Sequence, residues 1–579
     1  MSRSFPDRRP PTRLLALAAS GLLLSACGGG SDGDAPPFPA PPRLAAATPA
    51  TLRSCTDLAT RAAFANTTFS AATLVPAGTL TVAGQGVGEH CQVTGRMFSR
   101  ISPVDGQTYA IGFEMRLPRD WNGRFFHQVN GGTDGVVGTA TGGLGGGGPL
   151  SNGLAQGFAV ITSDAGHGAA QNPLFGLDPQ ARLDYGYQAV GKLTPMAKAL
   201  IATAYGKAPD RSYLVGCSNG GRHAMVGAAR YADQYDGILA GNPGFNLPKA
   251  AVAQLYGAQQ FNAVATSATD LSTSFTVAER ALVAARVLDR CDALDGATDG
   301  LVQDVQACKA AFSLERDVPT CTGARSGACL SGAQKTALNH IFTGARNSRG
   351  EAIYASFPWD AGITSTNWAG WKFSSSIGAA RDPVAVGFIF QVPPAPVSIL
   401  ADTRAFALNF SMDTDAPKIA ATSALYTESS LSFMTPPEAG NLSALRDRGA
   451  KMMVYHGMSD GVFSPDDTAA WYDRLRGAYG GVASDFARLY LVPGMNHCGA
   501  GPATDQFDMV SALVAWVEQG RAPDRVIASA RGPGNAGGVN TELPANWSAT
   551  RTRPLCPYPQ VARYQGTGET ESAASFSCQ

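Results

Sequence analysis

The chain has 579 residues, enough for one large domain with an insertion or for two or three ordinary domains. Its 45 basic and 45 acidic residues leave no formal net charge, and only 16% of all residues are charged. Proteins that bind nucleic acid usually carry a basic excess or a basic stripe, so nucleic acid is not an expected partner. The 67 glycines predict many tight turns and structured loops.

Residues 1–26 have the composition of an export signal. Arginines at positions 3, 8, 9 and 13 precede an apolar stretch at 14–24 that is too short for a stable membrane anchor. The stretch ends in Leu24-Ser25-Ala26-Cys27, which resembles the box at which bacterial lipoproteins are cut before a lipidated cysteine. A plain secretory signal is the alternative. Residues 27–50 are rich in glycine and proline and are expected to be a flexible linker. We therefore predict an exported protein, in the periplasm, outer membrane or cell surface, attached to a membrane only through Cys27.

Short apolar runs alternate with helical stretches from residue 110 onward. Strands are predicted at residues 110–117, 124–129, 158–163, 212–215, 237–241, 451–455 and 487–492, and helices at 185–205 and 221–231. This alternation predicts an α/β fold, a largely parallel sheet with helices on both faces. Residues 247–440 interrupt it with more Ser, Thr and Pro and an aromatic cluster at Trp359, Trp368, Trp371 and Phe373. We predict that 247–440 is an inserted lid domain between two parts of one domain, at 51–246 and 441–579.

A serine at the junction of a predicted strand and helix has the environment of a nucleophile. Residues 216–220 read Gly-Cys-Ser-Asn-Gly and fit G-x-S-x-G, a pattern that is weak evidence alone in a glycine-rich chain. Here a strand precedes it and a helix follows it, so Ser218 would sit in a sharp turn at the carboxyl end of the sheet. The helix N-terminus would add partial positive charge for a developing oxyanion. A structural glycine-rich turn is the alternative.

A nucleophilic serine needs a base, and four of the seven histidines follow Ser218: His223, His340, His456 and His497. His223 is too close in sequence to reach back, and His340 belongs to the predicted lid. Asp460 and His497 lie on loops after two successive predicted strands, as the order Ser, acid, His requires. We therefore predict Ser218, Asp460 and His497 as a catalytic triad, with His456 as a structural residue or the alternative base.

Eleven cysteines, less Cys27, leave ten (11 − 1), an even number that fits an exported, disulfide-bonded protein. Sequence alone does not fix their connectivity, but neighbours in sequence are the simplest pairs: Cys55–Cys91, Cys291–Cys308, Cys321–Cys329 and Cys556–Cys578. The remaining two, Cys217 and Cys498, directly precede Ser218 and follow His497, so a bridge between them would tie the two loops together. Zinc is not expected, because no CxxC or HxxxH spacing is present.

These motifs resemble those of the tannase and feruloyl esterase family, whose members join the nucleophile and histidine loops by such a disulfide. The likeness covers nearly the whole mature chain, including residues 121–126, 175–182, 456–460, 492–498 and 553–558. It implies an α/β-hydrolase fold, the five cysteine pairs above, and hydrolysis of aromatic acid esters through a serine acyl-enzyme. It also implies an oxyanion hole made by the backbone N–H groups of Gly132 and Asn219.

An acidic segment at residues 291–301 carries Asp292, Asp295 and Asp299 among glycine turns, a composition that suits a hard cation with oxygen ligands. A solvated acidic turn is the alternative. The resemblance implies a structural calcium held by these three side chains and by the carbonyl groups of Ala297 and Leu301. No organic cofactor is expected.

The acyl specificity is the least determined property. By the same resemblance, Phe463 and Trp371 line the substrate pocket, although packing is an alternative role. Residues 377–382 lack the pattern in which relatives that cleave terephthalate monoesters place an arginine on the free carboxylate. We therefore expect neutral or phenolic aromatic esters to be preferred, with terephthalate monoester hydrolysis as the alternative if Arg381 substitutes.

Two competing hypotheses use the same residues differently. One is a calcium-stabilised surface lipoprotein that binds ligands without catalysis, and the other is a peptidase or acyltransferase with the same triad. The intact Ser218, Asp460 and His497 favour an enzyme over a protein that only binds. We expect a monomer.

Overall fold

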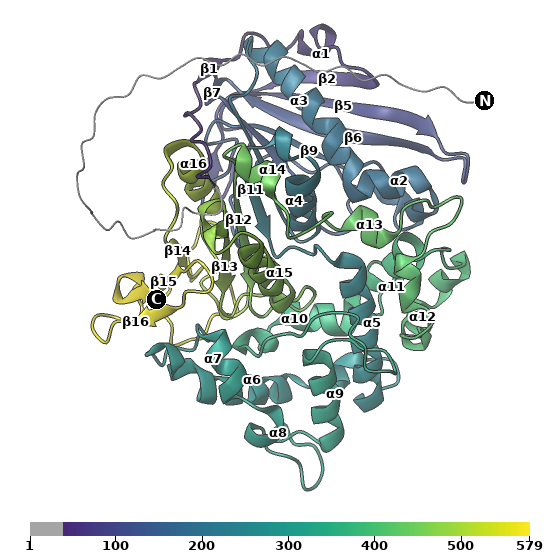
Figure 1. The fold of residues 1–579 in the computed structure, drawn as a ribbon, viewed down its shortest axis with the longest axis vertical. Coiled ribbons are helices and arrows are strands. Elements are labelled where there is room, and N and C mark those ends of the chain that lie inside the picture. Colours follow the sequence, from purple (N-terminus) through teal and green to yellow (C-terminus); the bar gives the residue numbers. More distant parts are fainter. Residues whose placement is uncertain (1–38) are drawn as a thin grey trace, which may run out of the picture. The chain divides into compact units, whose positions relative to one another are not determined.

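A nine-stranded sheet with the order β13-β12-β11-β10-β8-β9-β6-β5-β2 forms the centre of the computed structural model, which describes residues 39–579 (Figure 1). Its strands are β2 (Thr67–Val75), β5 (His90–Ile101), β6 (Thr108–Pro118), β8 (Arg124–Gln128), β9 (Ala159–Ser163), β10 (Arg211–Cys217), β11 (Gly237–Gly241), β12 (Lys451–Gly457) and β13 (Ala487–Val492). The predicted signal and Cys27 lie outside the described residues.

The sheet has a parallel part and an antiparallel part. All neighbouring pairs from β13 to β9 are parallel. The pairs β9–β6, β6–β5 and β5–β2 are antiparallel. The predicted α/β class is confirmed, and each predicted strand is present. Strands β2 and β5 were not foreseen, and together with β6 they make the sheet mixed rather than largely parallel.

Helices cover both faces of the parallel part, as the alternation of side chains along β10 requires. Leu214 points to α4 (Asn219–Arg230), where a Cβ added to Gly227 would lie 2.3 Å from it. Its neighbour Tyr213 points to the other face, where it and Leu513 of α16 (Met509–Gln519) both lie against Gly237. The other helices of this domain are α1 (Leu58–Arg61), α2 (Pro179–Leu183), α3 (Ala189–Tyr205) and α15 (Pro465–Ala478). The predicted helix at 185–205 differs at its start, where residues Asp184–Gln188 form a π-helix.

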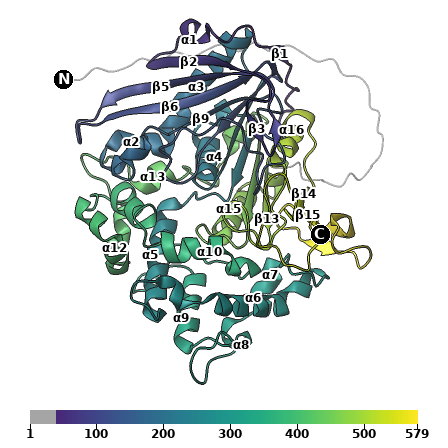
Figure 2. The same cartoon turned by 180° about the vertical axis from the view of Figure 1, so that it is seen from behind.

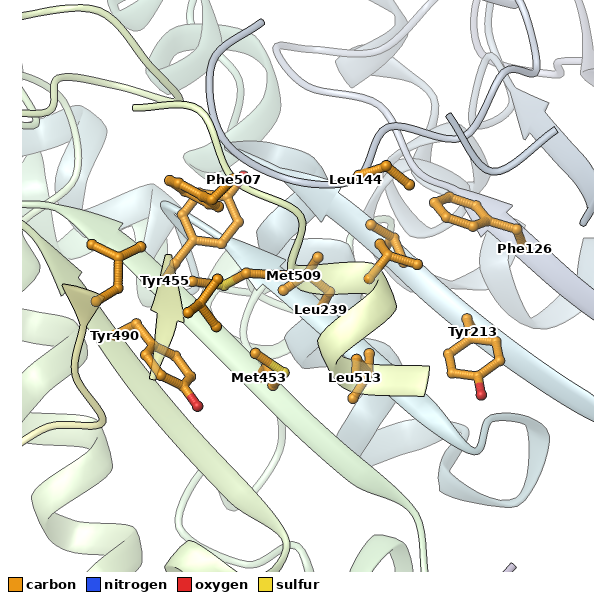
Figure 3. Close-up of a cluster of buried hydrophobic side chains, with 14 of the residues drawn as sticks. Phe126, Leu144, Tyr213, Leu239, Met453, Tyr455, Tyr490, Phe507, Met509 and Leu513 are labelled. Carbon is orange, nitrogen blue, oxygen red and sulfur yellow. The ribbon is translucent and has the colours of Figure 1, made fainter. Parts of the chain in front are cut away.

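The main core lies between the sheet and α16. Figure 3 shows Met509 and Leu513 of this helix beside Leu239 and Met453, side chains of two neighbouring strands. Each large apolar side chain buried in this way contributes about 1.5–3 kcal/mol. This packing fixes the strands whose carboxyl ends carry the predicted catalytic loops.

Residues 242–450, here called the helical segment, connect β11 to β12 and contain no strand. They hold α5 (Leu247–Val264), α6 (Val277–Cys291), α7 (Val305–Ala311), α8 (Leu314–Asp317), α9 (Gly332–Phe342), α10 (Thr366–Ala369), α11 (Asp382–Val384), α12 (Thr403–Asn409), α13 (Ser430–Met434) and α14 (Ser443–Asp447). In both views α5 to α9 gather far from β2, β5 and β6 (Figures 1 and 2). Much of the predicted aromatic cluster is core packing, since Trp359 stacks on Phe342 at 3.8 Å and Phe373 contacts Phe261 at 4.9 Å.

Five disulfides join the ten cysteines of the described residues, in the pairs Cys55–Cys91, Cys217–Cys498, Cys291–Cys308, Cys321–Cys329 and Cys556–Cys578. The last of these lies in the C-terminal part, which adds two small antiparallel sheets, β14 (Val526–Ser529) with β15 (Thr552–Leu555) and β16 (Ala562–Tyr564) with β17 (Phe576–Cys578). Within residues 39–579, no helix is both long and apolar enough to span a bilayer.

Candidate active site

Ser218 occupies a strained turn between β10 and α4. Its φ is 68° and its ψ −128°, a backbone conformation that non-glycine residues rarely adopt. The turn is possible because the strand, the helix and the loop after β8 approach closely. A Cβ on Gly220 would lie 2.5 Å from the carbonyl oxygen of Val129, and one on Gly216 2.7 Å from the same atom. Any side chain at these two positions would push the turn away from the sheet.

The structure brings the three predicted triad residues into one hydrogen-bonded chain. Nε2 of His497 lies 2.7 Å from Oγ of Ser218, and Nδ1 of His497 lies 2.8 Å from Oδ2 of Asp460. His497 and Asp460 follow β13 and β12 in adjacent loops and are both buried. With Nδ1 protonated and held by the carboxylate, Nε2 is free to accept the serine proton.

Asp460 has more partners than its role in a triad requires. Its Oδ2 also accepts a hydrogen bond from Nδ2 of Asn242 at 2.8 Å and lies 3.2 Å from Nε2 of His456. Burial alone would raise the pKa of Asp460, but its electrostatic interaction with His497 and the hydrogen bonds from both histidines outweigh burial and lower this pKa. His456 thus supports the acid and does not contact Ser218.

A disulfide ties the two halves of the site together. Cys217 and Cys498 are 281 residues apart in sequence, yet their Cα atoms are 6.1 Å apart. Each is the immediate neighbour of a triad residue, so the bond fixes the separation of the nucleophile turn and the histidine loop.

The two predicted oxyanion donors and Ser218 line the same pocket. Asn219 is the first residue of α4, and the loop after β8 places Gly131 so that its Cβ, if present, would be 3.5 Å from that of Ser218. Within the described chain, the backbone N–H groups of Gly132 and Asn219 donate to no backbone carbonyl. Two unpaired N–H groups beside a serine are suited to bind a developing oxyanion.

An apolar pocket opens beside Ser218, between the sheet and the helical segment. Trp371 and Phe463, both predicted to line it, pack edge-on against His497 with ring centroids 5.1 and 5.3 Å away. The remaining lining residues are Gly132, Thr133, Tyr185, Asn219, Leu247, Ala251, Arg381, Asp382, Ala385, Phe390 and Val462. A flat apolar group the size of an aromatic ring fits such walls.

The pocket contains one guanidinium group. Arg381 lies 5.2 Å above the ring of Trp371, and its Nη1 would be 2.9 Å from a Cβ on Gly132. It forms no salt bridge within residues 39–579, although its charge acts on the neighbouring Asp382. Burial raises the pKa of the adjacent Asp382 to about 7, which weakens that carboxyl as a competing anion. From the sequence, Arg381 was an open alternative to the missing arginine pattern, and in the structure it lines the pocket.

The five predicted calcium ligands form one buried loop. Asp292 accepts backbone hydrogen bonds from Asp299 and Gly300, while Oδ2 of Asp295 is buried without a partner. Burial, followed by the neighbouring carboxylates, raises the pKa of Asp295 to about 7. An orphaned carboxylate oxygen fits a cation, but Arg553 already pairs with Asp299, and no group of three His, Cys, Asp or Glu side chains in the described part of the chain is arranged to hold a metal. Ala297 and Leu301 are buried in the same loop.

Sequence reasoning missed several residues that complete the site. Tyr185 and Leu247 line the pocket, and Asn242 holds Asp460. Asp134, in the loop after β8, accepts a hydrogen bond from the side chain of Asn219. The sequence signal for Asp134 and Asn242 was their position, each just after a buried strand at the same sheet edge as Ser218.

Comparison with known proteins places these residues in context. The family model for tannase and feruloyl esterase matches residues 91–579. The chain is 42% identical over 528 residues to a mono(2-hydroxyethyl) terephthalate hydrolase from Piscinibacter sakaiensis, covering 85% of each protein. It is 26% identical over 483 residues to feruloyl esterase B from Aspergillus niger, covering 80% of this chain and 83% of the relative.

Solved structures share the fold at lower sequence identity. Feruloyl esterase B from Aspergillus oryzae superposes with a TM-score of 0.69 at 22% identity, covering 91% of this chain and 99% of that one. A tannin acyl hydrolase from Aspergillus niger superposes with a TM-score of 0.66 at 19% identity, covering 92% and 96%.

Proposed function

The chain belongs to the tannase and feruloyl esterase family and is a carboxylic ester hydrolase, and from this premise we propose that it cleaves esters of aromatic acids through an acyl-enzyme on Ser218. The observation that carries the proposal is the chain of short contacts from Oγ of Ser218 to His497 and on to Asp460, at 2.7 and 2.8 Å. A surface protein that only binds has no need of such an arrangement.

The reaction has two halves. Oγ of Ser218 attacks the ester carbonyl while Nε2 of His497 takes its proton, and Asp460 stabilises the imidazolium. The carbonyl oxygen becomes an oxyanion held by the N–H groups of Gly132 and Asn219. The tetrahedral intermediate collapses, and the leaving alcohol receives the proton from His497. Water then attacks the acyl-enzyme by the same route and releases the carboxylic acid.

The acyl group would occupy the apolar pocket. Trp371 and Phe463 both pack edge-on against the His497 ring, line the pocket and would contact a bound aromatic ring. Aromatic pairs of this kind contribute about 0.5–1.5 kcal/mol beyond buried area. Galloyl, feruloyl and benzoyl esters all present such a ring.

A terephthalate monoester is a second candidate substrate, favoured by Arg381. Its guanidinium faces the pocket without an ion-pair partner in the described chain, and a planar guanidinium binds a carboxylate by two parallel hydrogen bonds. The 42% identity to a mono(2-hydroxyethyl) terephthalate hydrolase points to the same acid.

We also propose that residues 247–440 are a lid, because Leu247, Trp371 and Arg381 all reach the pocket from this segment. A structural calcium in the loop at residues 292–301 would neutralise carboxylates that burial leaves uncompensated. Export is supported by five disulfides, a bond type that persists in oxidising compartments. A lipid on Cys27 would then be the membrane attachment.

A matched panel of esters tests the proposal. The mature protein is assayed on p-nitrophenyl acetate, p-nitrophenyl benzoate, methyl gallate, methyl ferulate and a terephthalate monoester. We expect turnover of at least one aromatic ester, and loss of nearly all turnover in Ser218→Ala at unchanged melting temperature. A folded Ser218→Ala variant that keeps a tenth of wild-type activity would contradict it.

A further inference from the structure

A buried polar network lies behind the two proposed oxyanion donors. Its centre is the side chain of Asp134, only 2% exposed, in the loop that carries Gly132. Oδ2 of Asp134 accepts a hydrogen bond from Nδ2 of Asn219 at 2.9 Å and lies 2.9 Å from Nε2 of His223. The loop that carries Gly132 is therefore hydrogen-bonded through this one oxygen to the first turn of α4.

Further hydrogen bonds of the network hold both donor residues, Asn219 and Gly132. Arg222, fully buried, donates through Nε to Oδ1 of Asn219 at 2.6 Å. It also donates to the carbonyl oxygen of Tyr185 at 3.0 Å, and the hydroxyl of Tyr185 donates to the carbonyl oxygen of Gly132 at 3.2 Å. Both residues that supply an oxyanion N–H thus belong to one closed circuit of hydrogen bonds.

Stability alone does not account for this circuit. Burial raises the pKa of Asp134 well above its usual value, and it also disfavours the charge of the buried Arg222 guanidinium. Such polar groups are costly to desolvate, and apolar side chains of similar volume would often stabilise a fold more. The local backbone is strained as well, since Asp134 has a φ of 54°. Burial, and then the charge of Arg222, keeps the pKa of His223 well below its usual value, so its ring is neutral and its Nε2 tautomer has an N–H to give.

We propose that Asp134 is a positioning residue of the oxyanion hole, which holds the Gly132 and Asn219 peptides at a fixed separation through its bonds to Asn219 and His223. The proposal rests on the hydrolase function above and adds residues that do not touch the substrate. A preorganised pair of donors binds the transition state without reorganisation, so a loosened pair should slow chemistry and leave ground-state binding unchanged.

Two substitutions break the circuit at different points. Asn219→Ala removes the side-chain bonds but keeps the backbone N–H that serves as the donor. Asp134→Asn keeps the shape of the side chain at the centre but replaces one carboxyl oxygen, an acceptor, by an amide group that donates. Asp236→Asn is the matched control, because Asp236 is also a buried carboxylate that accepts a backbone hydrogen bond, from Ser212, but lies at the opposite end of β10 and β11. We expect this control to lower the melting temperature and to leave kcat unchanged.

The readouts separate positioning from loss of structure. In both network variants kcat for p-nitrophenyl benzoate should fall about 10–100-fold while KM changes by less than about three-fold, since a fully lost donor costs about 10²–10³-fold. Inhibition by phenylboronic acid, which forms a tetrahedral adduct on a serine, should weaken by the same factor, and inhibition by benzoate should not change. The double variant should be no worse than the worse single variant, because both break one circuit.

Three results would overturn the inference. The first is a folded Asn219→Ala variant whose kcat stays within about three-fold of wild type. If Asp134→Asn does not fold, the Asn219→Ala variant decides the question alone. The second is weakening of boronate and benzoate inhibition together, which indicates collapse of the pocket. The third is a wild-type protein that cleaves no aryl ester and binds no boronate, which would overturn the proposed function as well.

Discussion

The catalytic loops and the helical segment meet at one pocket but are built differently. The loops that carry Ser218, Asp460 and His497 begin at the ends of packed parallel strands, and a disulfide joins the Ser218 turn to the His497 loop. The helical segment has no strand. It reaches the pocket through the first turn of α5, through the short α11 and through π-helical turns at Gly370–Ser375 and Ala385–Phe390. We infer that the sheet sets the chemistry and that the segment between β11 and β12 sets which acid is accepted.

The largest effect should come from a substitution in the catalytic loops. Asp460→Asn keeps the shape of the acid but presents an amide to His497, which disturbs its tautomer and removes the charge that stabilises the imidazolium. We expect kcat for p-nitrophenyl benzoate to fall about 10³–10⁴-fold with little change in KM. The measurement is the steady-state kcat, compared with that of the Asp236→Asn control. A loss of less than ten-fold would contradict the assignment of Asp460 to the triad.

Arg381→Ala should alter selectivity instead of chemistry. A charge-assisted pair with a carboxylate contributes about 1.5–3 kcal/mol, so kcat/KM for a terephthalate monoester should fall about 10–100-fold. The matching benzoate ester of the same alcohol should change by less than about three-fold. Arg381→Lys, which keeps the charge without the two-pronged geometry, should fall between them. Equal losses on both esters would show that Arg381 acts on the catalytic step and not on the choice of acid. They would contradict the division of roles between the sheet and the helical segment.

These two variants also mark what the sequence could predict. Ser218, Asp460 and His497 were found because each follows a buried strand and carries a local signature. The role of Arg381 could only be left open, because it lies between π-helical turns whose side-chain directions do not follow a regular period. Strand β2 was missed because it lies at the sheet edge and none of its residues is fully buried. The bonds of Asp134 and Asn242 join residues 85 and 218 positions apart, which no local pattern reports.

Removing the disulfide beside the triad should have a smaller effect on rate. Replacing Cys217 and Cys498 by Ala leaves the triad side chains in place but frees the histidine loop, so we expect kcat to fall about ten-fold. Stability should fall by at most about 5–6 kcal/mol in the chain-entropy model. The control is the double alanine variant of Cys321 and Cys329, a disulfide of the helical segment. Equal kcat values in the two double variants would contradict a special role for the first bond.

The smallest expected effect concerns calcium and stability. Burial raises the pKa of Asp295 from 3.8 to about 7. Without metal, the stability that protonation supplies is fully present below about pH 4 and is lost as the pH rises through about 7. Calcium should replace the proton there, so a chelator should lower the melting temperature by a few degrees at about pH 8 and by less at about pH 5.

Two substitutions control the calcium experiment. Asp295→Asn should abolish the difference between calcium and chelator, whereas Asp289→Asn, at an exposed position just before the loop, should keep it. Identical melting curves in calcium and chelator at about pH 8 would remove the proposed metal from this loop.

The central claim is that the acyl group passes through Ser218, and covalent trapping tests it most directly. The protein is treated with an aryl sulfonyl fluoride until esterase activity is lost, and the modified peptide is identified by mass spectrometry. We predict one adduct per chain, on Ser218, formed more slowly when benzoate is present. Complete inactivation with Ser218 unmodified, or full modification of Ser218 with activity retained, would contradict the account.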